Sequence, residues 1–254
     1  MVEIGISTAI CHDLHLFFSN LQSPHAGQFN STRCATRQKV SWVINGGMTC
    51  GIYAIISRMW DDRYATDEYR FGTQPNRFLE DCVHLLPPGA KVLSLGEGEG
   101  RNAVYLAGLG FDVTAVDCSA VGLDKARRLA RERGVALTTI TADLNDYPIQ
   151  PAAWDAIINF FCHMPTAERA PLHQRVVAGL KPGGAYILEL FNPDQPRFGS
   201  GGPTDRDLLM SVDDARRELP GLRLEVAREL TRRRDDADPS TPLVSVLQVL
   251  GILE

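Results

Sequence analysis

The sequence has few cysteines, and their spacing is not that of a metal or redox site. The six cysteines of this 254-residue chain lie at positions 11, 34, 50, 82, 118 and 162, and no two of them form a CxxC pair. We therefore expect free thiols and a cytoplasmic protein. Cys11, His12 and His15 lie close together, but no further ligands are evident, so we expect no metal.

The chain also lacks an excess of positive charge and a long apolar run. Its formal net charge of −5 gives no electrostatic reason to expect nucleic acid or an anionic membrane as a partner. The basic triplet 232–234 is followed at once by acidic residues, which indicates a charge-balanced exposed hairpin. The segment 40–57 has no charged side chain, but it contains polar residues and glycines and is shorter than the roughly 20 apolar residues of a membrane span. We expect one globular domain and no membrane partner.

The most informative segment runs from Val92 to Asn102. Apolar residues predict a buried strand, Gly96, Gly98 and Gly100 follow at every second position, and a helical pattern begins after them. Glycines let the backbone turn sharply and approach a ligand closely, and the start of a helix adds unpaired N–H groups. This order is typical of nucleotide-binding loops, although glycine-rich turns also arise for purely local reasons.

A second apolar strand, at 111–116, ends at an acidic residue. Asp117 follows the first glycine by about twenty positions, where a carboxylate suits the two hydroxyls of a ribose. An acidic residue at a strand end is often a helix N-cap, but Ser119 is the better cap for the helix predicted at 121–133, which Gly134 ends. One face of that helix is rich in arginine, and a solvated face explains it better than a nucleic-acid patch.

Strands and helices then alternate along the chain. The patterns predict further strands at 137–142, 153–161 and 185–191, and a helix at 171–180. Such alternation implies a parallel sheet with helices on both faces, which is a doubly wound α/β fold.

Four segments together resemble the class I S-adenosylmethionine-dependent methyltransferases. They are LSLGEGEGRNAVYLA (93–107), VTAVDCS (113–119), TADL (141–144) and LKPGGAYILELF (180–191). The resemblance extends over residues 59–254, and the segment 59–79 is similar to the small bacterial tellurite-resistance-type methyltransferases and their uncharacterised relatives. It implies a Rossmann-like, mostly parallel seven-stranded sheet whose antiparallel edge is a C-terminal hairpin of strands 222–230 and 243–250.

The resemblance also implies S-adenosylmethionine as the cofactor. In the family the acidic end of the second strand holds the ribose, residues after the third strand contact adenine, and the glycine loop passes under the methionine part. The family usually has an acidic residue where this chain has Ser94, and Glu97 or Glu99 can supply the missing negative charge. The implied cofactor-binding residues are Gly96, Gly98, Gly100, Asn102, Asp117, Cys118, Asp143, Leu144 and Phe160.

Two other functions fit the same strand, loop and helix. An NAD(P)-dependent Rossmann oxidoreductase would need a small residue at position 101, where this chain has arginine, and it gives no role to Asp143 or to the turn 181–184. A non-catalytic cofactor-binding protein is the other alternative. Methyl transfer to any acceptor would discriminate among the three.

Acceptor-site residues are expected past the carboxyl ends of the fourth and fifth strands, where open α/β sheets bind ligands. His163 is the best base or acceptor-orienting group, and its alternative role is to cap a turn or helix. Cys162 would need a thiolate-stabilising neighbour that is not evident. Further candidates for acceptor binding or for a lid are Arg63, Tyr69, Arg101, Asn192 and Arg197, although Tyr69 fits core packing equally well. The expected acceptor is a small molecule, a thiol or chalcogen compound first and another small metabolite second.

Residues 1–58 lack a repeating pattern and match nothing in the family. We expect them to be a poorly structured extension before a methyltransferase domain at 59–254. The hypothesis is that the extension is dispensable and is translated upstream of a true start at Met59.

Overall fold

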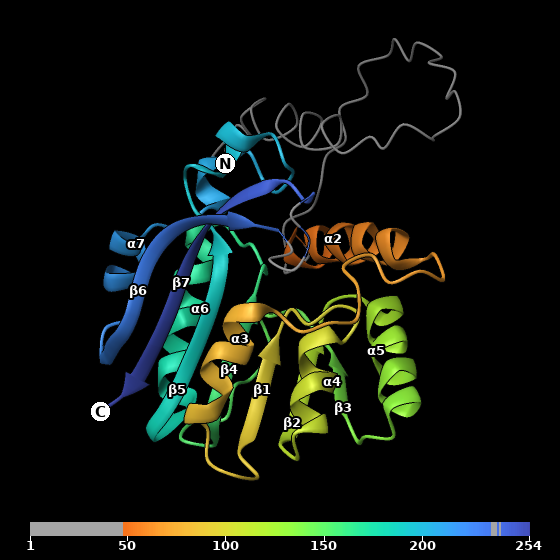
Figure 1. Cartoon of the computed structure of the whole chain (residues 1–254), viewed down its shortest axis with the longest axis horizontal. Coiled ribbons are helices and arrows are strands. Elements are labelled where there is room, and N and C mark those ends of the chain that lie inside the picture. The colour runs from red at the N-terminus through yellow and green to blue at the C-terminus, as the bar shows by residue number, and fades with distance from the viewer. Residues whose placement is uncertain (1–47, 235–237, 239) are drawn as a thin grey trace, which may run out of the picture. The chain divides into compact units, whose positions relative to one another are not determined.

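A seven-stranded sheet forms the centre of the part of the chain that the structure describes, namely residues 48–234, 238 and 240–254 of a computed structural model. The strand order is β3-β2-β1-β4-β5-β7-β6 (Figure 1). Strands β1 to β5 pair in parallel, whereas β7 runs antiparallel to β5 and β6. The predicted mostly parallel sheet with an antiparallel C-terminal edge is therefore confirmed. The strands are Lys91–Leu95 (β1), Asp112–Asp117 (β2), Thr138–Thr141 (β3), Trp154–Phe160 (β4), Leu180–Phe191 (β5), Leu222–Arg233 (β6) and Leu243–Leu253 (β7).

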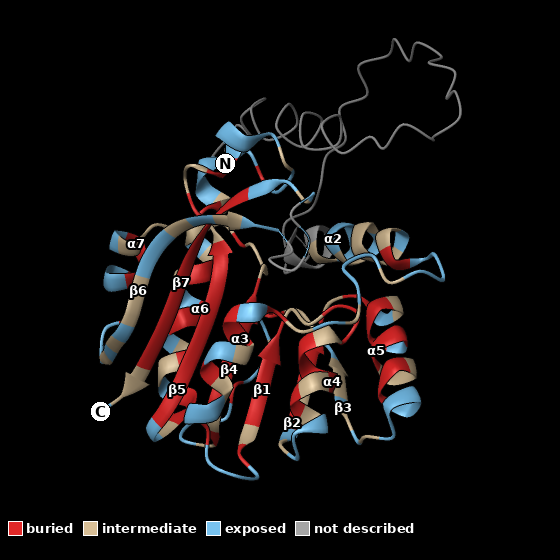
Figure 2. Ribbon diagram, in the orientation of Figure 1, coloured by how far each residue is buried: buried red, intermediate tan, exposed pale blue. Residues whose placement is uncertain are grey.

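Helices cover both faces of this sheet (Figure 1). Successive residues of a strand point to opposite faces, so Val92 joins the apolar core beneath α3 and α4, and Leu93 joins the core beneath α6 and α7. Figure 2 shows that β1, β4, β5 and β7 and the inner faces of these helices are mostly buried, whereas the edge strand β6 is largely exposed. The helices are α3 (Arg77–Cys82), α4 (Arg101–Gly108), α5 (Ala120–Arg133), α6 (Thr166–Gly179) and α7 (Val212–Glu218), with short 3-10 helices η1 (Val83–Leu85), η2 (Gln195–Phe198) and η3 (Arg206–Leu208).

Two predicted helix boundaries can be compared with the structure. The Ser119 side chain accepts a hydrogen bond from the N–H of Gly122, and Gly134 ends α5 with a φ of 67°, so both predicted ends of α5 are confirmed. Helix α6 begins at Thr166, and the predicted start at Pro171 is wrong. Proline is common in a first helical turn because its missing N–H is not needed there, but Pro171 lies inside the helix.

Helix α2 (Met48–Tyr64) begins before residue 59, where the domain boundary is expected from the sequence. Ser57 donates a hydrogen bond to the carbonyl of Cys118 at 2.8 Å, and the Asp61 carboxylate accepts one from the Ser119 hydroxyl at 2.6 Å. Residues 48–58 are therefore part of a helix that is bonded to the β2–α5 turn, rather than part of a poorly structured extension. Residues 1–47, with the Cys11, His12 and His15 cluster, lie outside the described residues.

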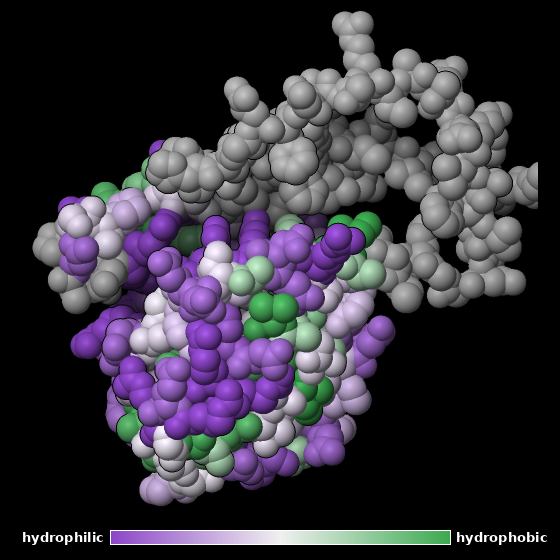
Figure 3. All heavy atoms as spheres, turned by 90° about the vertical axis from the view of Figure 1, so that its right-hand side faces the viewer, coloured by the Kyte–Doolittle hydropathy of each residue, from purple (hydrophilic) through white to green (hydrophobic). Residues whose placement is uncertain are grey.

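The arginine-rich face of α5 lies at the surface. Arg128 forms ion pairs with Asp67 and Glu132, both at 3.9 Å, and Arg127 pairs with Asp124. Figure 3 views the molecule from the side of α5, and hydrophilic side chains cover most of the described surface there. These contacts support the interpretation of a solvated helix face. No helix among the described residues is long and apolar enough to cross a membrane.

Candidate functional site

The glycine loop between β1 and α4 has a shape that only glycine tolerates. Gly96, Gly98 and Gly100 have φ angles of 63°, 64° and 95°, in the left-handed region that L side chains rarely adopt. A Cβ atom on Gly96 would lie 2.5 Å from the Cys162 side chain, and one on Gly98 would lie 2.6 Å from the Tyr64 hydroxyl. The first two glycines therefore admit close neighbours from β4 and α2. On Gly100 a Cβ would lie 2.7 Å from Cα of the α5 residue Ala126, so this glycine lets α4 pack against α5.

Asp117 lies at the carboxyl end of β2, directly beside this loop. Its Oδ2 accepts a hydrogen bond from the N–H of Gly98 at 2.8 Å, and its Oδ1 accepts one from the N–H of Ser119 at 2.7 Å. Burial raises the pKa of the Asp117 carboxyl above its usual value, against the opposing effect of these two N–H donors. Each carboxylate oxygen can accept more than one bond, so this geometry leaves capacity for the hydroxyls of a ligand.

Glu97 and Glu99 have different surroundings, which bears on the missing acidic residue at Ser94. Glu97 accepts hydrogen bonds from the N–H groups of Asn102 and Ala103, both at 3.0 Å, and from the Ser94 hydroxyl. Burial raises the pKa of Glu97, against the opposing effect of these hydrogen bonds, and its carboxyl lies at the N-terminus of α4, within the loop. Glu99 is instead 4% exposed and accepts bonds from the N–H groups of Arg70 and Phe71. Of the two expected substitutes for the missing carboxylate, only Glu97 contacts Ser94.

Glu99 also forms a buried ion pair that fastens the segment after α2. The ammonium of Lys125 lies 2.5 Å from Glu99 Oε1 and donates to the carbonyls of Thr66 and Glu68 at 2.9 and 2.6 Å. Tyr69 packs against α5 from this segment, and its hydroxyl donates to the Lys125 carbonyl at 3.2 Å. The pattern of the sequence did not indicate this pair, because its members are far apart in the chain and both are usually surface residues.

Helix α2 crosses the carboxyl edge of the sheet near β2 and β3 (Figure 1). Tyr53 of this helix lines a pocket of about 630 Å³ together with Ala142 and Asp143, which follow β3. The other lining residues are Ile140, Asp146, Tyr147 and Pro148. Asp143 Oδ1 accepts the N–H of Asn145 at 2.9 Å, and Leu144 is buried. The pocket lies at the place expected for adenine, and Tyr53 is a wall residue that sequence reasoning missed.

The turn after β4 approaches the glycine loop. Phe160 is buried at the strand end, and Phe161 has a φ of 60°, a strained value for a bulky residue. Cys162 packs against Gly96, and burial raises the pKa of its thiol to about 12. The thiol of Cys118 also has a raised pKa, because of burial and the nearby Asp117. Both thiols are therefore neutral, and neither is an activated nucleophile.

His163 follows Cys162 and has a defined protonation state. Its Nδ1 lies 3.0 Å from the carbonyl oxygen of Leu208. A carbonyl can only accept, so Nδ1 carries the proton of the neutral ring. Burial lowers the pKa of His163 to about 4, despite the hydrogen bond to Leu208, so the ring is neutral at pH 7. Nε2 then presents a lone pair, and it is buried with no hydrogen-bond partner among the described residues.

An aromatic group flanks this histidine, and β5, which carries Phe191, also carries a buried acidic residue of a charged cluster. The His163 ring stacks on Phe191 with centroids 5.2 Å apart, and Phe161 lies 4.9 Å from Phe191. Glu189 lies two residues before Phe191 on β5 and is fully buried. Its carboxylate accepts a hydrogen bond from the guanidinium of Arg232 at 2.5 Å. Arg101 interacts electrostatically with both Glu189 and Arg232, and burial lowers the pKa of its guanidinium. Of the basic triplet 232–234, Arg233 and Arg234 are exposed as predicted, whereas the side chain of Arg232 is only 12% exposed.

The polar atoms of the remaining candidate residues form contacts with neighbouring protein groups. Asn192 donates to Glu229 at 3.3 Å and accepts the N–H of Asp194, which holds the start of the loop after β5. Arg197 is exposed and pairs with Asp194. Arg63 stacks over Trp60 at 4.7 Å, on the helix α2. The Asn102 side chain accepts the N–H of Asn76 at 2.9 Å, so it links α4 to the segment before α3.

Comparison with known proteins gives a consistent result. The profile of the methyltransferase domain family matches residues 92–184. A 2-heptyl-1-hydroxyquinolin-4(1H)-one methyltransferase from Mycobacteroides abscessus is 31% identical over 104 residues, covering 40% of this chain and 46% of that protein. A ubiquinone biosynthesis O-methyltransferase from Xanthomonas axonopodis pv. citri is 27% identical over 149 residues, covering 58% of this chain and 62% of that protein. The chain thus spans about half the length of the curated relatives that it matches.

The solved structure of TehB from Haemophilus influenzae shares the fold. Its TM-score is 0.59 at 17% identity, and the superposition covers 78% of this chain and 67% of TehB. The matched segment 92–184 contains the glycine loop and Asp117, and the sheet has the strand order and antiparallel edge implied by the sequence resemblance. Residues 92–184 therefore match the methyltransferase domain family, and the chain shares the fold of TehB.

Proposed function

We propose that this protein is an enzyme that transfers a methyl group from S-adenosylmethionine to a small-molecule acceptor. The observation that carries the proposal is the position of the Asp117 carboxylate, bonded to Gly98 of a glycine loop at the carboxyl edge of the sheet. Ligands bind at this edge in open α/β sheets, where the strand order reverses. Here the reversal lies between β1 and β4, which both border the loop.

The residues at this edge fit the cofactor. Asp117 would hold the ribose hydroxyls, and the pocket beside Asp143 and Tyr53 would take the adenine, because its walls are largely apolar and flat side chains suit a base. Gly96 and Gly98 would let the backbone approach the methionine part closely. The Glu97 carboxyl lies in the same loop, and a positively charged ligand beside it would favour its ionised form.

The bound cofactor supplies a methyl group on a positively charged sulfur, which an acceptor lone pair takes up as the S–C bond breaks and leaves its electron pair on sulfur. The tasks left to the chain are to orient the acceptor, exclude water and receive a proton. Neither Cys118 nor Cys162 suits a covalent relay, since both thiols stay protonated. His163 suits the proton-accepting task, because its Nε2 is unprotonated and has no other partner in the described part of the chain.

The chemical class of the acceptor follows from two considerations. The resemblance to tellurite-resistance-type enzymes favours a thiol or chalcogen compound. Of the two relatives, one is named for a hydroxyquinolinone substrate and the other for an O-methyltransferase activity, which favours an acceptor hydroxyl. A neutral O–H, S–H or N–H group is common to most of these acceptors, and it is the kind of group that the His163 lone pair would bind.

Binding and turnover can be tested separately. Calorimetry with S-adenosylhomocysteine and with NADH compares the two cofactor classes, and we expect binding of the first and none of the second. Incubation of the full chain with methyl-labelled S-adenosylmethionine and a panel of thiols, selenols, phenols and amines, followed by mass spectrometry, identifies the acceptor. Tight NADH binding without any response to S-adenosylhomocysteine would refute the proposal. Cofactor binding with no labelled product across the panel would favour the non-catalytic alternative.

A further inference from the structure

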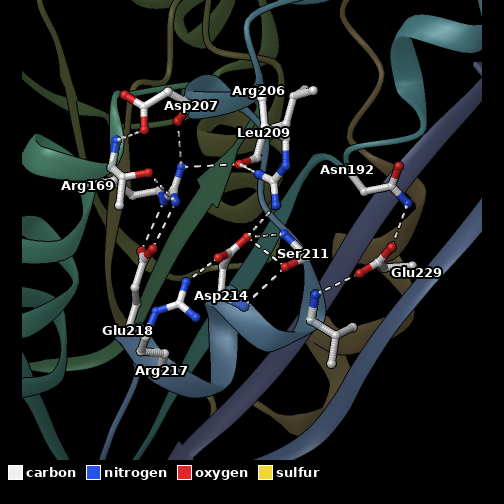
Figure 4. Close-up of polar contacts among 12 residues, drawn as sticks. Arg169, Asn192, Arg206, Asp207, Leu209, Ser211, Asp214, Arg217, Glu218 and Glu229 are labelled. Atoms are coloured by element: carbon white, nitrogen blue, oxygen red, sulfur yellow. Dashed lines mark hydrogen bonds and ion pairs between the residues drawn. The ribbon is translucent and has the colours of Figure 1, made fainter.

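The guanidinium of Arg169 donates hydrogen bonds to the backbone next to His163 and next to Leu208, the two residues that are joined by a hydrogen bond. Arg169 lies on α6 and is 2% exposed. Its Nη1 donates to the carbonyl of Met164, the residue after His163, at 3.4 Å. The same nitrogen donates to the carbonyls of Asp207 and Leu209, which flank Leu208, at 3.2 and 3.5 Å (Figure 4). One buried side chain thus fixes both the histidine turn and the carbonyl to which the histidine donates.

The position of Arg169 is itself set by a buried carboxylate. Glu218 of α7 accepts from Arg169 Nε at 3.0 Å and from Nη2 at 2.8 Å, in a bidentate pair (Figure 4). Its Oε2 also lies 2.9 Å from Nδ1 of the fully buried His173. Burial by itself would raise the pKa of Glu218, but the hydrogen bonds from His173 and Arg169 outweigh it and hold the pKa at about 2. The carboxylate is therefore charged at neutral pH, and its two hydrogen bonds fix the orientation of the planar Arg169 guanidinium.

This arrangement determines which nitrogen of His163 is protonated. The neutral histidine side chain in water favours the tautomer with the proton on Nε2. The Leu208 carbonyl, held 3.0 Å from Nδ1, favours the other tautomer. Buried polar atoms in native proteins nearly always have a partner, so the unpartnered Nε2 indicates a place for a ligand atom that donates a hydrogen bond.

We propose that Arg169 and Glu218 are positioning residues that hold His163 with its proton on Nδ1, so that Nε2 accepts a hydrogen bond from the O–H, S–H or N–H group of the methyl acceptor. The proposal rests on the methyl-transfer function proposed above. The charged pair acts only through the backbone of residues 164 and 207–209, and it touches neither acceptor nor cofactor.

The test is the tautomer of His163 in the full chain, measured by long-range ¹H–¹⁵N NMR on protein with ¹⁵N-labelled histidine. The sequence has six histidines, so the His163→Asn variant is used to assign the signal. In the wild type we expect a protonated Nδ1 and an unprotonated Nε2. In Glu218→Gln and in Arg169→Lys we expect a measurable fraction of the Nε2–H tautomer, because the Leu208 carbonyl is no longer held against Nδ1.

Arg175→Lys is the matched control. Arg175 lies on the same helix and also donates to two carbonyls, those of Tyr147 and Leu144 at 2.9 and 2.6 Å, but it has no recorded contact with the His163 turn. We expect the wild-type tautomer in this variant, even if its melting temperature falls. The comparison separates the loss of positioning from the general loss of stability that a merely structural arginine would cause.

Several outcomes would overturn the proposal. A wild-type His163 with its proton on Nε2 refutes it without any variant, and so does an unchanged tautomer in folded Glu218→Gln. The same shift in Arg175→Lys would also refute it. Titration of each sample with S-adenosylhomocysteine keeps the two proposals distinct. A correct tautomer in a protein that does not bind this ligand would refute the methyltransferase function, and leave the positioning role of Arg169 intact.

Discussion

Replacement of Asp117 by asparagine should weaken cofactor binding more than it weakens the fold. The carboxylate receives the N–H groups of Gly98 and Ser119 at 2.8 and 2.7 Å and would also receive the ribose hydroxyls. Asparagine keeps one acceptor oxygen and turns the other into a donor. The loss of one charge-assisted bond to the ligand costs about 1.5–3 kcal/mol. Since 1.4 kcal/mol is a factor of ten in affinity, we expect the Kd of S-adenosylhomocysteine to rise about 10- to 150-fold.

The assay is calorimetry together with thermal unfolding of the same samples. One of the two buried N–H donors loses its acceptor in Asp117→Asn, which should destabilise the protein by about 1–3 kcal/mol. Asp112→Asn is the matched control, because Asp112 lies at the exposed amino end of the same strand. We expect the control to bind S-adenosylhomocysteine like the wild type.

The result that would refute the reasoning is an unchanged Kd in a folded Asp117→Asn protein. It would mean that the ribose lies elsewhere and that the two N–H bonds of Asp117 serve only the turn. A tenfold loss of affinity in Asp112→Asn would also contradict the reasoning, because the effect would then not depend on the carboxyl edge of the sheet.

Four further predictions concern the site and its supports. The pH–rate profile should show no limb near pH 6.5, because the pKa of His163 is about 4. His163→Ala should lower kcat by about two to four orders of magnitude with an acceptor that carries an O–H, S–H or N–H group. A wild-type kcat in this variant would show that His163 is not part of the site. Gly100→Ala should destabilise the protein by about 1–3 kcal/mol in thermal unfolding, and more than Gly110→Ala, which has a similar positive φ but open space around it; equal losses would contradict the packing argument. Lys125→Met should cost about 3–5 kcal/mol in urea unfolding, because it leaves a buried carboxylate without its cation, and a loss below 1 kcal/mol would show that this carboxylate is solvated. A chain that begins at Met59 should melt earlier and bind S-adenosylhomocysteine more weakly than one that begins at residue 48, since it lacks most of α2; equal behaviour would support the dispensable-extension hypothesis.

The lowered pKa of His163 also has a consequence for stability. The unfolded side chain titrates near 6.5 and the folded one near 4, so the unfolded chain binds more protons between these values. The contribution of this residue to the free energy of unfolding is therefore complete above about pH 6.5 and is lost as the pH falls toward 4. The sequence alone does not predict this lowered pKa, because the burial of the ring is not visible in the local pattern.

Local signals in the sequence were sufficient for the elements that border the glycine loop. Three glycines at alternate positions permit positive φ angles, and a serine before an apolar helical pattern favours a helix cap, as Gly98 and Ser119 illustrate. These preferences depend on a few neighbouring residues. The start of α2 did not follow from them, because an uncharged stretch with several glycines has a weak helical pattern, and contacts such as that of Ser57 with Cys118 hold it in place.

Long-range charge pairs were beyond the sequence for a different reason. Glu189 lies on β5 and Arg232 lies on β6, with α7 between them in the chain, and Arg169 and Glu218 lie on different helices. Each residue alone fits a solvated surface equally well, and only the fold brings the partners together. The position of His163 after the fourth strand was predicted, whereas its tautomer depends on such a pair and was not.

The three buried ion pairs have a common placement that explains why they persist in the interior. Lys125 with Glu99 holds the segment after α2, Arg232 with Glu189 links the end of β6 to β5 across β7, and Arg169 with Glu218 holds the turn after β4. A buried ion pair is seldom more stable than apolar residues of the same volume, because both charges lose their hydration. Its hydrogen bonds are directional, however, and each cation here also donates to backbone carbonyls of a loop. The pairs therefore fix the conformation of the loops around the carboxyl edge of the sheet. Apolar contacts are not directional and would not fix it in the same way.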